Sequence, residues 1–398
     1  MKQRVFLIVF ILYLSCSKSS ENVDEVEQVN TEQTIQGNQT TSETTSTTVG
    51  TSTAPSPAPT FDRESMLIFW ADSIIVPAYQ NFNTDLLILS ESVNAFASNP
   101  SEVNLDLVRS NWITSYKSWQ HIEMFNIGMA EEIFYINRMN VYPLNVSRVE
   151  NNISSSDFEI EHPNDYPAQG FPALDYLLFG IGSNDSEILE KFNSENSSYL
   201  MYLVIITNKM VELTNIVIND WPSYRDVFIA STENTATSSI NKLTNDFIYY
   251  YEKGFRANKI GIPAGVFSAD ELPELVEAYY KKDISKTLAL EAINAISAFF
   301  KGQAYNDENT TGNSFKTYLE FLQTTKDGNP LGQLIIDQFE IAKNSINELN
   351  DDFTIQIQND NLQMLLTYDH IQVAVVLMKV DMLQALNINV DYIDADGD

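Results

Sequence analysis

The segment VNLDLVRSNWITSYKSWQHIEMFNI, residues 103–127, decides the fold class of this 398-residue chain. Its large apolar side chains recur in steps of three and four residues, at Leu105, Val108, Trp112, Tyr116 and Trp119. This spacing places them on one face of an α-helix. The alternating pattern of a β-strand is scarce in the rest of the chain, so we predict an all-α fold.

Similar apolar spacing predicts further helices over 62–97, 199–219, 235–253, 285–301, 331–350 and 361–387. Long helices joined by short turns favour antiparallel bundles. The pair Trp221-Pro222 lies near the middle of the helical part, and proline commonly ends a helix. We therefore expect two helical bundles packed side by side, the first over 61–220 and the second over 221–390, followed by an acidic tail over 391–398.

The amino terminus has the pattern of an export signal. Lys2 and Arg4 precede an apolar run over residues 5–14, and Cys16 follows directly. The run is about half as long as a membrane-spanning helix, so cleavage is expected rather than a permanent transmembrane anchor. Cys16 is the single cysteine of the chain, and its position resembles a lipobox. We predict a signal peptide over 1–16 with lipidated Cys16; because Tyr13 stands where a lipobox usually has leucine, cleavage elsewhere is the alternative.

Residues 17–60 differ in composition from everything that follows. They are rich in Ser, Thr, Asn, Gln and Glu, contain no aromatic residue, and end in the Pro-rich stretch APSPAP. Such a segment cannot build a core. We predict a disordered linker that tethers a soluble body to the membrane.

The charge balance excludes one class of partner. The chain has 54 acidic and 23 basic side chains, a formal charge of −31. This charge repels phosphate backbones and anionic lipid headgroups. We therefore expect no nucleic-acid partner, and contact with the membrane through the lipid anchor only.

Two carboxylates stand in apolar surroundings. Glu123 follows Trp119 by four residues on the predicted apolar helix face, and Arg109 lies on the same stripe almost four turns earlier. Asp175 is the single charged residue of the segment GFPALDYLLFG, residues 170–180. A buried carboxylate without a partner is costly and has a raised pKa. Each of these acids is therefore either paired with another element or part of a polar site.

These residues carry a family resemblance. Arg109 and Trp112, followed by Trp119, Glu123, Phe125 and Gly128, resemble the first motif of the imelysin family, which ends in Glu-x-Phe-x-x-Gly. Tyr142-Pro143-Leu144 is similar to the Trp-Pro step that follows it. Residues 170–180 are similar to the Gly-x-His-x-x-Glu segment of the family, and residues 259–265 and 394–398 also match. The resemblance extends over residues 61–398.

The resemblance implies an all-α fold of two bundles, a motif near their shared cleft and an association with iron or haem acquisition. Some members are described as metallopeptidases. This chain departs from the motif, because Pro172 replaces the His and Asp175 replaces the Glu. Proline offers no side-chain ligand, and metal-dependent hydrolysis needs several fixed ligands and a water position. We therefore do not expect peptidase activity through this motif.

The expected ligand site is the cleft between the bundles. We expect Glu123 and Asp175 as metal ligands there, and Trp119, Arg109, Tyr176 and Pro172 beside them. Carboxylate and tyrosine oxygens suit a hard cation such as ferric iron better than zinc. His121, His162 and His370 do not form a recognisable zinc spacing.

Three functions remain open on the sequence. The first is a lipid-anchored binding protein of the cell envelope, at the periplasmic or surface face of the outer membrane, which takes part in iron, haem or other metal acquisition. The second is a metallopeptidase that uses Glu123, Asp175 and one distant histidine. The third is a non-catalytic module that binds another envelope protein.

Overall fold

This computed structural model describes residues 60–156, 158–193 and 197–392. The predicted signal peptide, Cys16 and the linker up to residue 59 lie outside these residues, as does the acidic tail beyond Tyr392. The described part forms one compact unit.

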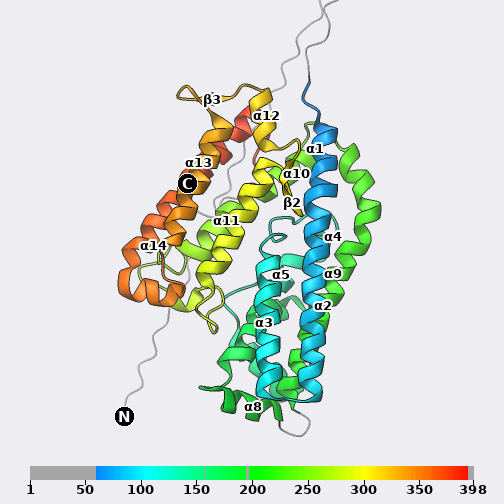
Figure 1. Ribbon diagram of the computed structural model, residues 1–398, viewed down its shortest axis with the longest axis vertical. Helices are drawn as coiled ribbons and strands as arrows, with labels where there is room; N and C mark the ends of the chain where they lie inside the picture. The colour runs from blue at the N-terminus through cyan, green and yellow to red at the C-terminus, as the bar shows by residue number, and fades with distance from the viewer. Residues whose placement is uncertain (1–59, 157, 194–196, 393–398) are drawn as a thin grey trace, which may run out of the picture. The chain divides into compact units, whose positions relative to one another are not determined.

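Twelve helical segments make up the described part of the chain up to residue 230. They are α1 (Arg63–Phe69), η1 (Trp70–Ile75), α2 (Val76–Ser98), α3 (Glu102–Trp119), α4 (Met129–Glu132), α5 (Tyr135–Met139), α6 (Val146–Ser155), η2 (Pro163–Ala168), α7 (Gly170–Asp175), η3 (Tyr176–Gly180), α8 (Asp185–Asn193) and α9 (Ser198–Ala230). In this set α2 packs along both α3 and α9 (Figure 1). Ser101 begins α3 by accepting the backbone N–H of Asn104, which satisfies one of the free donors of the first turn.

The second set of helices begins at residue 239. It consists of α10 (Ser239–Tyr249), η4 (Tyr250–Gly261), η5 (Pro273–Leu275), α11 (Ser285–Lys301), α12 (Phe315–Phe321), α13 (Leu331–Asn347), α14 (Phe353–Val376), η6 (Leu377–Met382) and α15 (Leu383–Leu386). Here α13 packs against α11 and α14, and η4 packs against α14 and α10 (Figure 1). The two sets touch where α11 meets α3. The all-α prediction is confirmed.

The strands are short and form two separate antiparallel pairs. β1 (Gln303–Ala304) pairs with β2 (Asp307–Thr311), and β3 (Thr325–Lys326) pairs with β4 (Asn329–Pro330). Gly302, with φ +68, ends α11 and turns the chain into the first pair. Both pairs are local hairpins between helices, so they leave the fold class unchanged.

Two predicted helix ends are wrong. The helix predicted over 103–127 stops at Trp119, and residues 120–128 form a chain of turns and irregular backbone. The helix predicted over 199–219 continues to Ala230, straight through Trp221-Pro222. The predicted division of the body at 220/221 therefore falls within a helix. Packing of α9 against α2 outweighs the loss of one hydrogen bond at Pro222.

The third difference concerns α14, which was predicted to begin at residue 361. It begins at Phe353, where Asp352 accepts the backbone N–H groups of Thr354 and Ile355. Asp360 interrupts it with non-helical backbone angles. The predicted start thus corresponds to this kink.

Helix α9 is the one described helix long and apolar enough to pass a composition test for a membrane span. In the tested window, 44% of the residues are buried inside the body. Its buried residues include Leu203, Ile206, Met210 and Leu213, which repeat at helical spacing. We therefore describe it as a core helix.

Candidate functional site

A buried polar cluster lies where the two sets of helices meet. Asn140 Nδ2 donates to Glu123 Oε1 at 2.8 Å and to Glu277 Oε1 at 3.0 Å. Lys259 Nζ donates to Glu277 Oε2 at 2.6 Å and lies 3.8 Å from Glu123 Oε2. The side chains of Lys259 and Glu277 are only 1% and 3% exposed. Two carboxylates thus share one ammonium group away from solvent.

Four different elements supply this cluster. Glu123 lies in the irregular segment after α3, and Asn140 ends α5. Lys259 lies in η4, which has the wide i→i+5 hydrogen bonding of a π-helix, a feature often found at functional sites. Glu277 precedes α11, and Ser285 in the first turn of α11 donates to its backbone carbonyl. The cluster therefore exists only when both helix sets are folded together.

The charges of the cluster are not balanced. Burial raises the pKa of Glu123, Lys259 opposes this rise, and the carboxylate of Glu277 adds to it. Tyr250 also donates to Glu123 Oε2 at 3.2 Å. The ion pair expected as one alternative for Glu123 is thus present, but Lys259 is closer to Glu277 than to Glu123. The single ammonium group of Lys259 cannot neutralise both carboxylates. Glu123 therefore either keeps a negative charge that is only partly neutralised or takes up a proton.

Glu123 also faces a cavity of about 450 Å³, which we call the Glu123 cavity. The other lining residues are Met124, Asn126, Ile136, Asn137, Asn140, Val141, Tyr142, Asp246, Tyr249, Tyr250, Lys253, Gly254 and Asn258. They come from both helix sets, and their polar groups are carboxylates, phenols, amides and one ammonium group. A cavity of this size is within the range of small-molecule sites.

Burial favours the neutral forms of three acidic side chains of the Glu123 cavity, Asp246, Tyr142 and Tyr250. Burial raises the pKa of Asp246 to about 8, and the carboxylates of Glu131 and Asp391 add to the rise. Burial likewise raises the pKa of Tyr142 and Tyr250 well above the ordinary value, and neighbouring carboxylates contribute. The phenols therefore stay protonated at neutral pH and act as hydrogen-bond donors. Such a lining recognises oxygen atoms on a polar ligand.

A bare metal ion has a poorer fit. Among the residues that the structure describes, no three His, Cys, Asp or Glu side chains are grouped closely enough to hold a metal ion. Lys259 already supplies a cation between Glu123 and Glu277.

Asp175 does not line the Glu123 cavity. Its two carboxylate oxygens accept the backbone N–H groups of Tyr280 at 2.8 Å and Lys281 at 2.9 Å. Burial raises the pKa of Asp175 to about 7, and these two N–H groups oppose the rise. Asp175 thus fixes the loop that carries Glu277. Of the two acids expected as metal ligands, Glu123 lines this cavity and Asp175 does not.

The structure explains why position 170, at the start of the same motif, is a glycine. Its φ of +73° lies in the left-handed region, and a Cβ atom there would lie 2.1 Å from the backbone oxygen of Met139. Only glycine allows this approach without strain. Pro172, two residues later, is buried inside α7 and does not line the Glu123 cavity. The motif therefore packs the segment beside Asn140 against α7.

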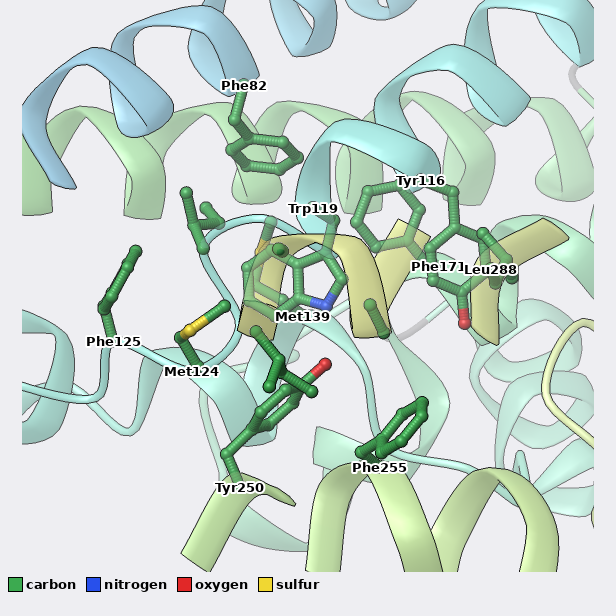
Figure 2. Close-up of a cluster of buried hydrophobic side chains, with 14 of the residues drawn as sticks. Phe82, Tyr116, Trp119, Met124, Phe125, Met139, Phe171, Tyr250, Phe255 and Leu288 are labelled. Atoms are coloured by element: carbon green, nitrogen blue, oxygen red, sulfur yellow. The ribbon is translucent and has the colours of Figure 1, made fainter. Parts of the chain in front are cut away.

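The other expected site residues have structural contacts. Arg109 donates to the backbone oxygen of Leu178 and pairs with Asp185 at 2.8 Å, so it holds the end of η3. Tyr176 donates to Glu150 at 2.5 Å. In Figure 2, Trp119 lies among buried side chains from both helix sets, including Phe82, Phe171 and Tyr250. None of Arg109, Trp119 or Tyr176 lines the Glu123 cavity.

The three histidines have different contact partners. His121 Nε2 is 3.4 Å from Glu291, His162 Nδ1 accepts the backbone N–H of Asn164, and His370 Nδ1 is 3.1 Å from Ser345 Oγ. His121 and Glu123, although two residues apart, face different cavities.

Several site residues were not expected from the sequence. These are Asn140, Tyr142, Asp246, Tyr250, Lys259 and Glu277. The charge of Lys259 within the apolar stretch KIGIPAGVF, residues 259–267, was the available signal. A lone charge in such a stretch needs a buried partner, as the same reasoning showed for Glu123.

Comparison with known proteins gives consistent results. The family model for imelysin (peptidase M75) matches residues 75–374. The chain is 20% identical over 186 residues to iron-regulated protein A of Synechococcus elongatus, a match that covers 45% of this chain and 48% of the relative. The chain thus spans about half the length of that curated relative in the match.

Two solved structures are similar in fold. An imelysin-like protein from Psychrobacter arcticum 273-4 has a TM-score of 0.65 at 16% identity, over 83% of this chain and 97% of the other. A protein from Parabacteroides distasonis ATCC 8503, described as a "putative iron-regulated protein A precursor", has a TM-score of 0.61 at 16% identity, over 81% and 96%. At these identities the likeness shows the helical fold. Because the family model matches most of its length, the chain belongs to the imelysin family.

Proposed function

We propose that this protein is a lipid-anchored binding protein of the cell envelope that takes part in iron acquisition and binds its iron cargo in the Glu123 cavity. The observation that carries the proposal is the cavity itself, which brings Glu123, Asp246 and two phenols together between the two sets of helices. Two similar proteins, from Synechococcus elongatus and Parabacteroides distasonis, carry the name iron-regulated protein A, which supports an iron-related role. The export signal and Cys16 support the envelope location.

The form of the cargo follows from the donors. The protonated phenol of Tyr142 and the lining amides other than Asn140 can donate hydrogen bonds to a ligand, whereas a bare ferric ion needs several anionic oxygens. A ferric ion held by a small oxygen-rich chelator presents acceptors to these donors. We therefore propose a small iron chelate as the ligand, with Glu123 nearest to its positive parts.

The peptidase alternative has less support. Metal-dependent hydrolysis needs three fixed protein ligands and an open water position. In the ranges that the structure covers, no such group of side chains occurs, and Lys259 contacts both Glu123 and Glu277. Binding without catalysis is the simpler function for these residues.

The test uses the full mature chain and ferric citrate as the probe, with haemin as a second probe. We expect ferric citrate to raise the melting temperature and to release heat in calorimetric titration. Glu123→Gln, Asp246→Asn and Tyr142→Phe should each weaken binding about tenfold, because each removes one polar contact of about 1–2 kcal/mol.

Asp185→Asn is the matched control, because it removes a carboxylate at the partly exposed Arg109 pair outside the cavity. It should bind ferric citrate like the wild type. No response of the wild type to ferric citrate or haemin would contradict the proposal, as would equal binding by Glu123→Gln. If haemin raised the melting temperature and ferric citrate did not, the proposed site would stand and the proposed ligand would be haem instead of an iron chelate. Loss of fatty-acid labelling in Cys16→Ala tests the anchor.

A further inference from the structure

We propose that a second cavity, lined by other residues of the segment 120–128 than the Glu123 cavity, binds a small organic carboxylate. Its volume is about 480 Å³. We call it the Ser297 cavity. It lies between the segment after α3, helix α11, the hairpin β1–β2 and α13. It shares no lining residue with the Glu123 cavity, so this inference stands apart from the iron proposal.

A buried hydroxyl group in this cavity has no protein partner. Ser297 is 7% exposed, and its Oγ makes no hydrogen bond within the described part of the chain. Its side chain is thus about nine-tenths buried in the cavity wall. An unsatisfied buried hydroxyl costs about 1–3 kcal/mol. A ligand oxygen at this position would recover that energy.

The acids of the Ser297 cavity mostly have basic partners already. Glu291 pairs with Lys117 at 2.9 Å and with His121 at 3.4 Å. The hydrogen bond from His121 is the main cause that lowers the pKa of Glu291 to about 2. Glu291 therefore stays ionised and is neutralised within the protein. Glu340 similarly has Lys301 at 3.6 Å.

Two charged side chains of the Ser297 cavity remain, Lys343 and Glu308. Lys343 favours an anionic ligand, and Glu308 lies at the exposed edge of the cavity. Lys343, half-buried on α13, has no hydrogen bond or ion pair with any residue that the structure describes. Glu308 lies on the exposed strand β2, where solvent screens its charge. The ammonium group of Lys343 is available to a ligand carboxylate.

Apolar side chains form the rest of the wall. Phe125 and Phe299 pack edge to face, with ring centroids 5.1 Å apart, and Ile74 and Ala295 lie beside them. The cavity therefore offers a cation, a hydroxyl group and an apolar surface. This combination fits an organic acid with an apolar body, its carboxylate at Lys343 and an oxygen near Ser297.

Benzoate is the probe, and benzyl alcohol, which keeps the ring and loses the charge, is the matched probe control. Using the full mature chain, saturation-transfer NMR and calorimetry should detect benzoate and not benzyl alcohol. Lys343→Gln should weaken benzoate binding at least about tenfold, since a charge-assisted hydrogen bond is lost. Ser297→Ala should weaken it by about fivefold and should itself fold normally, because it removes an unsatisfied hydroxyl group.

Lys316→Gln is the matched protein control, because Lys316 pairs with Glu320 on α12 away from the cavity. It should bind benzoate like the wild type, as should Glu123→Gln. Three outcomes would overturn the proposal: no benzoate signal with the wild type, equal affinity in Lys343→Gln and Lys316→Gln, or loss of benzoate binding in Glu123→Gln. The last outcome would place benzoate in the Glu123 cavity.

Discussion

Replacing Lys259 with methionine should lower the free energy of unfolding by about 3–5 kcal/mol at neutral pH. The lysine side chain is 1% exposed and is shared by Glu277 at 2.6 Å and Glu123 at 3.8 Å. Methionine keeps most of the volume and removes the charge. Two buried carboxylates then face each other without a cation, and at least one must take up a proton.

The measurement is urea unfolding followed by tryptophan fluorescence, with Trp119 buried close to the cluster. The double variant Lys259→Met/Glu277→Gln should recover more than half of the loss, because it removes one of the two uncompensated charges. Lys286→Met is the control: its partner Asp351, at 2.6 Å, is largely exposed, so this ion pair should be worth less than about 1 kcal/mol.

Acidification gives a further check, since lowering the pH protonates the unpaired carboxylates. The stability gap between Lys259→Met and the wild type should narrow toward about pH 4, near the ordinary carboxyl pKa values. A loss below about 1 kcal/mol, or a double variant as unstable as the single one, would refute the reasoning that Lys259 is the internal cation of the cluster.

Three other predictions concern the surrounding residues. Because the pKa of Asp246 is raised to about 8 in the folded state, its contribution to stability is complete below the unfolded value and is lost as the pH rises through about 8. Unfolding in urea at about pH 5 and about pH 9 should show this loss, and Asp246→Asn should reduce it. Asp175→Ala should cost about 1–3 kcal/mol and speed hydrogen exchange at the amides of Tyr280 and Lys281, whereas unchanged exchange would contradict its role in holding the loop. Gly170→Ala should cost about 1–3 kcal/mol through its positive φ and the contact with Met139, and a melting temperature equal to that of the wild type would argue against this strain.

The sequence predicted the fold class because helical spacing is a local property. Residues 105–119 carry the pattern, and the structure keeps all of them in α3. The end of this helix was misplaced, since residues 120–127 retain apolar side chains that pack in the same core without helical backbone. Glu123 nonetheless keeps its position relative to Trp119, because its N–H still bonds to the Trp119 carbonyl at 3.1 Å.

The site was predicted only in part, for a physical reason. The cost of burying Glu123 indicated that a partner was needed, but no local pattern identified Lys259 or Glu277, which come from distant segments. Asp175 is the single charged residue of the segment 170–180, which indicated that its side chain needs a polar partner. Its partners are backbone N–H groups, which no side-chain pattern can reveal.

The segment 120–128 lines two cavities: His121 and Phe125 line the Ser297 cavity, and Glu123 and Met124 line the Glu123 cavity. Because this segment is irregular backbone rather than helix, neighbouring residues along it can reach separate cavities. A substitution at one of these four residues therefore tests one cavity without removing a side chain from the other.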